Sequence, residues 1–430
     1  MRSGVFRFVH AADLHLDSPF HGIRASAPFV AEALADASIR ALDSVVELAV
    51  ARRAAFVLFA GDIYDGPERG LRAQLCFRRA LEQLTECGIA SFVVHGNHDP
   101  VEVGWSAIRA WPSLVTVFGA HEVGSAAIEV NGEQVATVQG ISYGRRDERS
   151  NLALRFGRPP GPGLAVGVLH CNVGGMPGHD DYSPCSLQDL RAAGIDYWAL
   201  GHIHTRAVLA GAEGETYAVY SGNTQGRSIA EAERGAKGVT LVTADAAEGV
   251  VTDLEFVPTD TVRFQDVPVD VTTRADLGEV CASLTSSAYE LARAADGRSL
   301  VLRARLYGRG QVHRDLSREG AVAGLLRELR DDAGETHPFT WWDNVVDATR
   351  PALGRAEVER RNDFLSDLLA LSDTVQSERE ALRALASRAG TDSMPAALRA
   401  LSIELIEEDE QLAALLSQAT DLALDLVADG

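Results

Sequence analysis

The sequence has no long apolar run. No stretch of its 430 residues approaches the roughly 20 consecutive apolar residues that a membrane-spanning helix needs. The N-terminus also lacks an apolar signal core followed by a small-residue cleavage site. These two absences argue against a membrane span and against export, so we expect a cytoplasmic protein with no membrane partner.

Cysteine is scarce. The five cysteines are an odd number, lie far apart in the sequence and include no Cys-x-x-Cys pair, so neither a disulfide framework nor a thiolate zinc site is expected. Cys171 alone stands beside a candidate metal ligand, and we favour its interpretation as a small buried side chain.

Positive charge is scarce as well. The net charge is −21, whereas a protein that binds nucleic acid usually presents a basic surface. Much of the deficit lies at one end, because residues 356–430 contain 16 acidic and 6 basic residues. Lys237 is the only lysine, so nearly every basic residue is an arginine, a bias that we interpret as compositional.

Against this background, five short apolar runs stand out because each leads into side chains that can bind a metal. A typical example is residues 91–94, which run into Gly96-Asn97-His98-Asp99. Strand ends that share an edge of a sheet bring their following residues together, so five such events predict one metal site. The five sets are Asp13 with His15, Asp62, Asn97 to Asp99, His170, and His202 with His204.

Amphipathic stretches at residues 31–53 and 71–87 separate the first strands and predict helices. Strands that alternate with helices are typical of α/β layer architectures. Further strand-like pieces at residues 115–118, 126–130 and 134–138 predict a mixed sheet or a pair of facing sheets.

The chemical motifs stop after Pro258. Residues 263–345 predict a small α+β unit of strand, helix and strand, at 267–271, 277–295 and 300–306. Trp341-Trp342 near its end could stack on bases, but neighbouring tryptophans at a domain junction are more typical of a core.

Residues 346–430 predict helices. One runs from Ala356 to about Ser387, and a second begins at Ser393 and Pro395. These acidic helices with apolar stripes can pack on their own chain or form a docking module for a partner protein. The chain length suggests two or three domains, and we expect three, at 1–262, 263–345 and 346–430.

The candidate ligands suit two metal ions. Two pairs are separated by one residue, a spacing that places both side chains on the same side of an extended backbone. The aspartate after the second strand has two carboxylate oxygens and can bridge. Two divalent ions about 4 Å apart polarise a phosphoryl group, and a nitrogen and oxygen ligand set without thiolate favours Mn²⁺. The seven ligands are Asp13, His15, Asp62, Asn97, His170, His202 and His204.

Other residues near these motifs are candidates for catalysis and substrate binding. His98 is placed to protonate the leaving oxygen, the alternative being a structural turn histidine, and Asp99 to orient His98 or a neighbouring group. Asp65 is expected to support the site rather than to bind metal. Arg206 and Arg227 are candidate phosphate contacts, with a surface or salt-bridged role as the alternative.

Taken in order, these motifs resemble those of the calcineurin-like metallophosphoesterases. The motifs are Asp13-x-His15, Gly61-Asp62-x-x-Asp65, Gly96-Asn97-His98-Asp99, His170 and Gly201-His202-x-His204. More narrowly, residues 10–20, 197–206 and 221–227 resemble the bacterial DNA repair exonucleases of the SbcD and YhaO type. The resemblance covers residues 5 to about 262.

This resemblance implies a four-layer α/β fold with two facing sheets between helices. It also implies an Mn²⁺-dependent nuclease acting on DNA, an exonuclease with endonuclease activity left open. One metal would be held by Asp13, His15, Asp62 and His204, and the other by Asp62, Asn97, His170 and His202, with His98 as the catalytic histidine. A capping domain and C-terminal helices that bind an SMC-like coiled-coil ATPase are implied as well, and a homodimer stays open.

Two other functions remain open. The same two metals could act on a small phosphoester or nucleotide, for which an acidic surface is no handicap. Alternatively, the domain could be a non-catalytic scaffold that binds DNA ends or regulates an ATPase. Salt separates these alternatives, because DNA binding weakens steeply as salt rises whereas hydrolysis of a small phosphoester barely responds.

Overall fold

The computed structural model describes residues 4–18, 27–66, 68–175, 180–211, 216–331, 337–352, 355–361, 363–389, 412–417, 419–420 and 423. The chain divides into two compact units. The first comprises Met1–Gln265, Ala294–Val301 and Glu335–Trp341, and the second comprises Asp266–Arg293, Leu302–Gly334 and Trp342–Gly430. The expected division into three domains stays a prediction.

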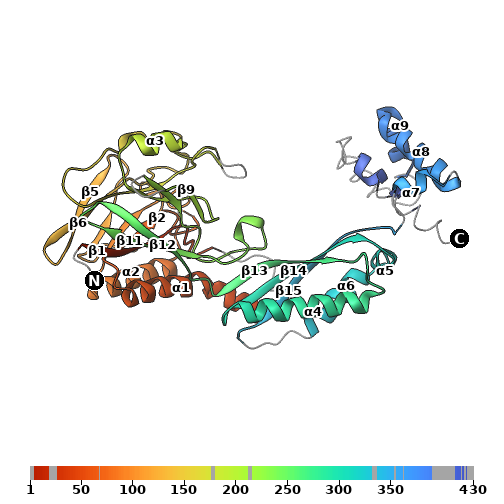
Figure 1. Ribbon diagram of the computed structural model, residues 1–430, viewed down its shortest axis with the longest axis horizontal. Helices are drawn as coiled ribbons and strands as arrows, with labels where there is room; N and C mark the ends of the chain where they lie inside the picture. Colours follow the sequence, from red (N-terminus) through yellow and green to blue (C-terminus); the bar gives the residue numbers. More distant parts are fainter. Residues whose placement is uncertain are drawn as a thin grey trace. The chain divides into compact units, whose positions relative to one another are not determined.

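The first unit contains a six-stranded sheet with the order β12-β11-β1-β2-β3-β4 (Figure 1). Strands β1 to β4 are parallel, and β11 is antiparallel to both β1 and β12. The residues that follow β1, β2 and β3 therefore emerge at one edge of the sheet, next to one another. The strands are β1 (Val5–Ala11), β2 (Phe56–Ala60), β3 (Ala90–Val94), β4 (Val115–Val117), β11 (Gly238–Asp245) and β12 (Val250–Pro258).

A second six-stranded sheet has the order β5-β6-β7-β8-β10-β9. Its four inner strands are parallel, and the two edge strands are antiparallel to their neighbours. The strands are β5 (Gly124–Val130), β6 (Glu133–Gly140), β7 (Leu164–His170), β8 (Tyr197–Gly201), β9 (Ala207–Ala210) and β10 (Tyr217–Tyr220). His170, the fourth predicted metal-binding set, is thus the last residue of β7, and the fifth set follows the adjacent strand β8.

Apolar side chains on the facing sides of the two sheets form a core between them. Phe8 stacks on Phe56 at 4.6 Å between ring centroids, and Tyr197 of the other sheet meets Phe8 edge-on at 5.2 Å. The intervening residues point the other way, because side chains alternate between the faces of a strand. Val9 and Val57, for example, belong to the core shared with the helices on the outer face of the first sheet.

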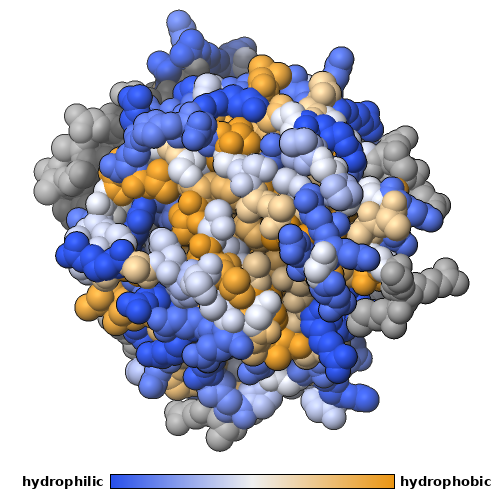
Figure 2. All heavy atoms as spheres, turned by 90° about the vertical axis from the view of Figure 1, so that its left-hand side faces the viewer, coloured by the Kyte–Doolittle hydropathy of each residue, from blue (hydrophilic) through white to orange (hydrophobic). Residues whose placement is uncertain are grey.

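Helices cover both outer faces, which completes a four-layer α/β fold as expected (Figure 1). Helices α1 (Pro28–Ala51) and α2 (Leu71–Glu86) lie on the first sheet, and α3 (Leu187–Ala192) and the 3₁₀ helix η1 (Leu152–Arg155) lie on the second. Trp198 of β8 anchors α3, since its indole N–H donates to the Leu190 carbonyl at 3.0 Å. On the face drawn in Figure 2, apolar and polar residues are interspersed, as is usual for a protein surface.

The segment after the motifs forms a third sheet with the order β13-β14-β15. This segment contains more elements than the strand, helix and strand expected, because α5, α6 and β15 follow. The elements are β13 (Val262–Asp270), α4 (Leu277–Ala294), β14 (Ser299–Arg309), α5 (Val312–Leu316), α6 (Ala321–Asp331) and β15 (Thr340–Arg350). Trp341 and Trp342, at the start of β15, are both buried, which favours their interpretation as core residues.

The C-terminal helices are α7 (Arg355–Glu359), α8 (Phe364–Ser377) and α9 (Arg379–Ala389). The expectation of one helix from Ala356 to Ser387 is wrong. Asp363 begins a new helix by accepting the Leu365 N–H at 3.0 Å, and Glu378 is extended at φ −105° and ψ 102°. The helix expected from Ser393 and Pro395 begins outside the described residues. Within those residues, every helix falls short of the length or apolar character that a membrane span requires.

Candidate metal centre

The loops after β1 and β2 are hydrogen-bonded to each other and place their polar residues at one point. The Asp13 N–H donates to the Gly61 carbonyl at 3.1 Å, and the His15 N–H donates to the Asp62 carbonyl at 3.0 Å. Asp13, His15 and Asp62 have φ values of 52°, 43° and 50°, a region that costs a non-glycine residue about 1–3 kcal/mol. The side chains therefore meet through strained turns, and not through the extended backbone assumed from the spacing.

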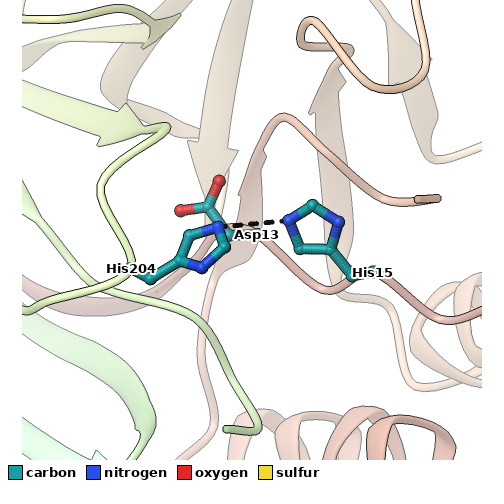
Figure 3. A group of neighbouring side chains, drawn as sticks. All are labelled: Asp13, His15 and His204. Atoms are coloured by element: carbon teal, nitrogen blue, oxygen red, sulfur yellow. Dashed lines mark hydrogen bonds between the residues drawn. The ribbon is translucent and has the colours of Figure 1, made fainter. Parts of the chain in front are cut away.

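The first ligand cluster consists of Asp13, His15 and His204 (Figure 3). The Nε2 atoms of the two imidazoles lie 3.2 Å apart. Oδ2 of Asp13 is buried and has no hydrogen-bond partner among the residues that the structure describes. A buried carboxylate oxygen normally has a partner, and its lack of one beside two facing ring nitrogens fits a cation between them.

The second cluster consists of Asp13, Asp62 and His170. Oδ2 of Asp62 lies 3.4 Å from Nε2 of His170 and 3.8 Å from Nε2 of His15, so this carboxylate reaches from its own cluster towards His15 of the first cluster. Oδ1 of Asn97 lies 3.0 Å from Nε2 of His170. Nδ1 of His170 donates to the Ala60 carbonyl at 3.0 Å, which directs its Nε2 towards the other ligands.

His202 lies beside this second cluster. Its ring centroid is 5.3 Å from that of His170, and its backbone N–H donates to Oδ1 of Asp13 at 2.9 Å. Its Nε2 faces the Asp180 carbonyl at 3.0 Å, and a carbonyl can only accept. A bond from this imidazole to a metal would therefore come from Nδ1.

The charges of the cluster are strongly coupled. Burial raises the pKa of Asp13, and burial followed by the charge of Arg227 lowers the pKa of His15 to about 4. Burial alone would raise the pKa of Asp62, but the neighbouring imidazoles, chiefly His170, hold it well below its ordinary value. Burial opposes protonation of His170, yet Asp62 and Asp13 raise the pKa of His170 to about 9. Bound protons thus offset the negative charge of the carboxylates, and a bound cation would displace these protons.

His98 lies at the accessible side of the cluster. Its ring stands edge-on to His15 with centroids 4.9 Å apart, and its backbone N–H donates to Oδ1 of Asp62 at 3.0 Å. Nδ1 of His98 donates to the Asp65 carbonyl at 2.9 Å. The imidazole is only partly buried, so Nε2 is the ring atom left to meet a substrate.

Asp99 is directed at a neighbouring group rather than at His98. Its carboxylate accepts Nδ1–H of His95 at 2.8 Å, the N–H of Gly96 at 2.9 Å and the N–H of Ile63 at 2.9 Å. This buried carboxylate therefore fixes the loop after β3 to the loop after β2. His95 was not among the sequence candidates, although its position four residues before Asp99 is a local signal.

The two candidate arginines contact protein groups. Nη1 of Arg227 lies 2.6 Å from Oδ1 of Asp65, which corresponds to the salt-bridged alternative. The Arg206 guanidinium lies 5.6 Å from the centre of the Phe256 ring, and within the described part of the chain its Nε is buried without a hydrogen-bond partner. The proposed role of both arginines as phosphate contacts stays a prediction.

One residue at the site was missed altogether. Glu233, in the 3₁₀ helix η2 (Glu231–Glu233), accepts Nδ1–H of His204 at 2.6 Å. It is separated from His204 by 29 residues and lies in a stretch without apolar periodicity or a motif. Local pattern therefore could not have found it.

Comparisons with known proteins agree with this geometry. Residues 6–206 match the calcineurin-like phosphoesterase family, and residues 264–350 match the middle domain of metallophosphoesterase YhaO. The chain is 33% identical over 342 residues to the "uncharacterized metallophosphoesterase YhaO" of Bacillus subtilis (strain 168), an alignment that covers 80% of this chain and 81% of that protein.

More distant similarity extends to other proteins. Over 211 residues the chain is 28% identical to the DNA double-strand break repair protein Mre11 of Aeropyrum pernix, covering 46% of this chain and 49% of that protein. A solved dimetal phosphatase from Danio rerio is 14% identical with a TM-score of 0.34, covering 59% of this chain and all of that one, a likeness too low to bear on the fold. The match to YhaO of Bacillus subtilis, which covers 80% of this chain and 81% of that protein, establishes the family.

Proposed function

We propose that this chain, which belongs to the calcineurin-like phosphoesterases and to their YhaO-type branch, is an Mn²⁺-dependent DNA nuclease. The family and the ligand clusters support a metal-dependent phosphoesterase. The finer part of the proposal is that it hydrolyses phosphodiester bonds of DNA, as an exonuclease, in repair. The observation that carries the chemistry is the bridging position of Asp62 between His15 and His170.

The residues present fit two divalent ions. The first would be held by the cluster around His15 and His204, and the second by the cluster around His170. Asp13 belongs to both clusters, and Asp62 is the carboxylate that we propose the two ions share. Such ions polarise a phosphoryl group and lower the pKa of bound water. We choose Mn²⁺ because the proposed donor atoms are nitrogen and oxygen. The nearby thiol of Cys171 is not one of them, since it faces Cys185 with 3.8 Å between the sulfur atoms. The proposed ligands are Asp13, His15, Asp62 and His204 for the first ion, and Asp62, Asn97, His170 and His202 for the second.

His98 would deliver the proton to the leaving oxygen. Its Nδ1–H is held by the Asp65 carbonyl, so the doubly protonated ring would offer Nε2–H to a substrate. Its backbone bond to Asp62 fixes its place relative to the shared ligand. Asp99 would act indirectly, because its hydrogen bond from the Gly96 N–H holds the loop that carries Asn97 and His98.

The DNA part of the proposal is supported by the similarity to Mre11, whose name assigns it to double-strand break repair. We further propose that the C-terminal helices dock on a coiled-coil ATPase. Phe364 and Leu371 are seven residues apart on α8 and are 65% and 62% exposed, which leaves an apolar face for a partner helix. The homodimer and the cytoplasmic location stay predictions.

The test is digestion of end-labelled single- and double-stranded DNA by the purified protein with Mn²⁺. Wild type should release nucleotides, whereas His98→Ala and Asp62→Ala should not. His121→Ala is the matched control, since the side chain of that histidine is 89% exposed and pairs with the surface residue Glu102. Intact DNA together with cleavage of an aryl phosphodiester by wild type would refute the DNA assignment and leave the phosphoesterase.

The alternative substrate is a small phosphoester or nucleotide, and the net charge of −21 favours it. A rise from low to moderate salt should then leave the rate nearly unchanged. A nuclease that contacts several phosphates should lose activity steeply over the same range, at substrate concentrations below saturation.

A further inference from the structure

Each imidazole of the first ligand cluster has a carboxylate behind it. Nδ1 of His204 lies 2.6 Å from Oε1 of Glu233. Nδ1 of His15 lies 2.9 Å from Oδ1 of Asp65, although the angle is too bent for a hydrogen bond. The opposite ring atoms, the two Nε2 atoms, face each other at 3.2 Å. A carboxylate therefore lies at Nδ1 of both histidines, as a hydrogen bond at His204 and as a close charged contact at His15.

Arg227 connects the two carboxylates. Its Nη1 lies 2.6 Å from Oδ1 of Asp65, and its backbone N–H donates to Oε2 of Glu233 at 3.0 Å. Nε of the same guanidinium lies 3.5 Å from Oε1 of Glu233, beyond a good hydrogen bond but close enough for attraction. The guanidinium is therefore directed at protein carboxylates at this site.

The position of Glu233 is itself fixed. Nδ2 of Asn223 donates to its Oε2 at 2.7 Å. The ammonium of Lys237, the only lysine of the chain, donates to the His204 carbonyl at 2.7 Å and also to the Ala232 carbonyl. Lys237 thus connects the backbone of His204 to Ala232, the residue before Glu233. An ammonium group with three donors suits two carbonyls better than a planar guanidinium does.

We propose that Asp65, Arg227 and Glu233 form a positioning unit that aims Nε2 of His15 and of His204 at one metal position. A carboxylate at Nδ1 fixes the tautomer and the orientation of a metal-binding imidazole. The guanidinium lies 2.6 Å from Asp65 and 3.5 Å from Glu233 and offsets part of the charge of these two carboxylates. These three are positioning residues, and the unit rests on the proposed metal-dependent function.

The unit makes a distinct prediction for Arg227. If Arg227 positions a ligand, its loss weakens metal binding and leaves KM for the substrate unchanged once metal is saturating. If Arg227 instead contacts substrate phosphate, its loss raises KM at saturating metal and leaves metal affinity unchanged. The two roles therefore separate in one set of measurements.

The experiment measures Mn²⁺ stoichiometry and affinity of the full chain by calorimetry and by the electron paramagnetic resonance of free Mn²⁺. Glu233→Ala and Asp65→Ala should weaken one of two Mn²⁺ sites by about 10- to 100-fold, as loss of such supporting carboxylates does elsewhere. Arg227→Ala should weaken the same site, and Arg227→Lys should restore part of the affinity. Glu233→Gln, which keeps the shape and an acceptor oxygen, should lie between wild type and Glu233→Ala.

Arg158→Ala is the matched control. It removes an Arg–Asp pair of similar length, 2.7 Å to Asp196, that is away from the ligands. Unchanged Mn²⁺ affinity in folded Glu233→Ala, Asp65→Ala and Arg227→Ala proteins would overturn the proposal. Metal binding is measured without substrate, so this result is distinct from a failure of wild type to digest DNA.

Discussion

Acid should destabilise the first unit through a histidine that is not a metal ligand. His10 lies in β1, fully buried, with Nε2–H donating to the Leu200 carbonyl at 3.2 Å and Nδ1 accepting the Tyr197 hydroxyl at 3.0 Å. These bonds span from the first sheet to the second, and a neutral imidazole satisfies both of them. Burial, followed by smaller effects that include the charge of Arg206, lowers the pKa of His10 to about 3.

The sign and size of the effect follow from proton binding. Between pH 6.5 and 3 the unfolded chain binds a proton at His10 that the folded chain does not, so stability falls as pH falls. Each pH unit below 6.5 costs about 1.4 kcal/mol, or about 2 kcal/mol by pH 5. This contribution is fully present above the unfolded pKa.

The assay is urea unfolding of metal-free protein at pH 7.5 and at pH 5, for wild type and His10→Gln. Glutamine can keep both an acceptor and a donor but does not titrate. Subtracting the two pH dependences removes the effects of the other histidines, and the difference should be about 2 kcal/mol in favour of the variant at the lower pH. Equal pH dependences for the two proteins would refute the assignment of a neutral His10.

Three further predictions concern the metal centre and the core. Asp13→Asn should abolish high-affinity Mn²⁺ binding in calorimetry yet raise the melting temperature of metal-free protein, because it removes a buried carboxylate with an unpartnered oxygen; a lower melting temperature would contradict this. Gly96→Ala should also abolish metal binding, since the new Cβ would collide with Oδ1 of Asp62 and lie 2.7 Å from Nε2 of His170; retained two-site binding would count against the geometry. Phe8→Ala should lower the free energy of unfolding by about 3–5 kcal/mol in urea titrations, because the ring is fully buried between the sheets, and a loss below 1 kcal/mol would exclude it from the core.

The sequence was informative where a function depends on the end of a strand. Asp13, Asp62 and His170 each stand at the end of an apolar run. The first two runs are the neighbouring strands β1 and β2 of one sheet, and the third is β7 of the other sheet. Alternation and apolar length are local signals, so the four layers and the convergence of the candidate ligands could be predicted. The helices over residues 31–53 and 71–87 were also placed to within three residues.

Contacts between irregular segments could not be predicted. Glu233 meets His204 because a loop returns across the site, and no periodicity in the sequence records that return. The interruption at Asp363 is a local cap that the apolar stripe of the surrounding helices obscured. The turns at Asp13 and His15 have positive φ, which the side-chain identities alone do not favour. Tertiary hydrogen bonds decide these features.

His15 follows a strand of the first sheet, and His204 follows a strand of the second, 189 residues later. An ion bound to both would therefore act as a reversible cross-link that closes a very long loop of the chain. Closing such a loop lowers the entropy of the unfolded chain, in the same sense as a disulfide does. The proposed metal centre would then also link the two sheets. The supply of metal would determine the lifetime of the folded chain as well as its catalytic rate.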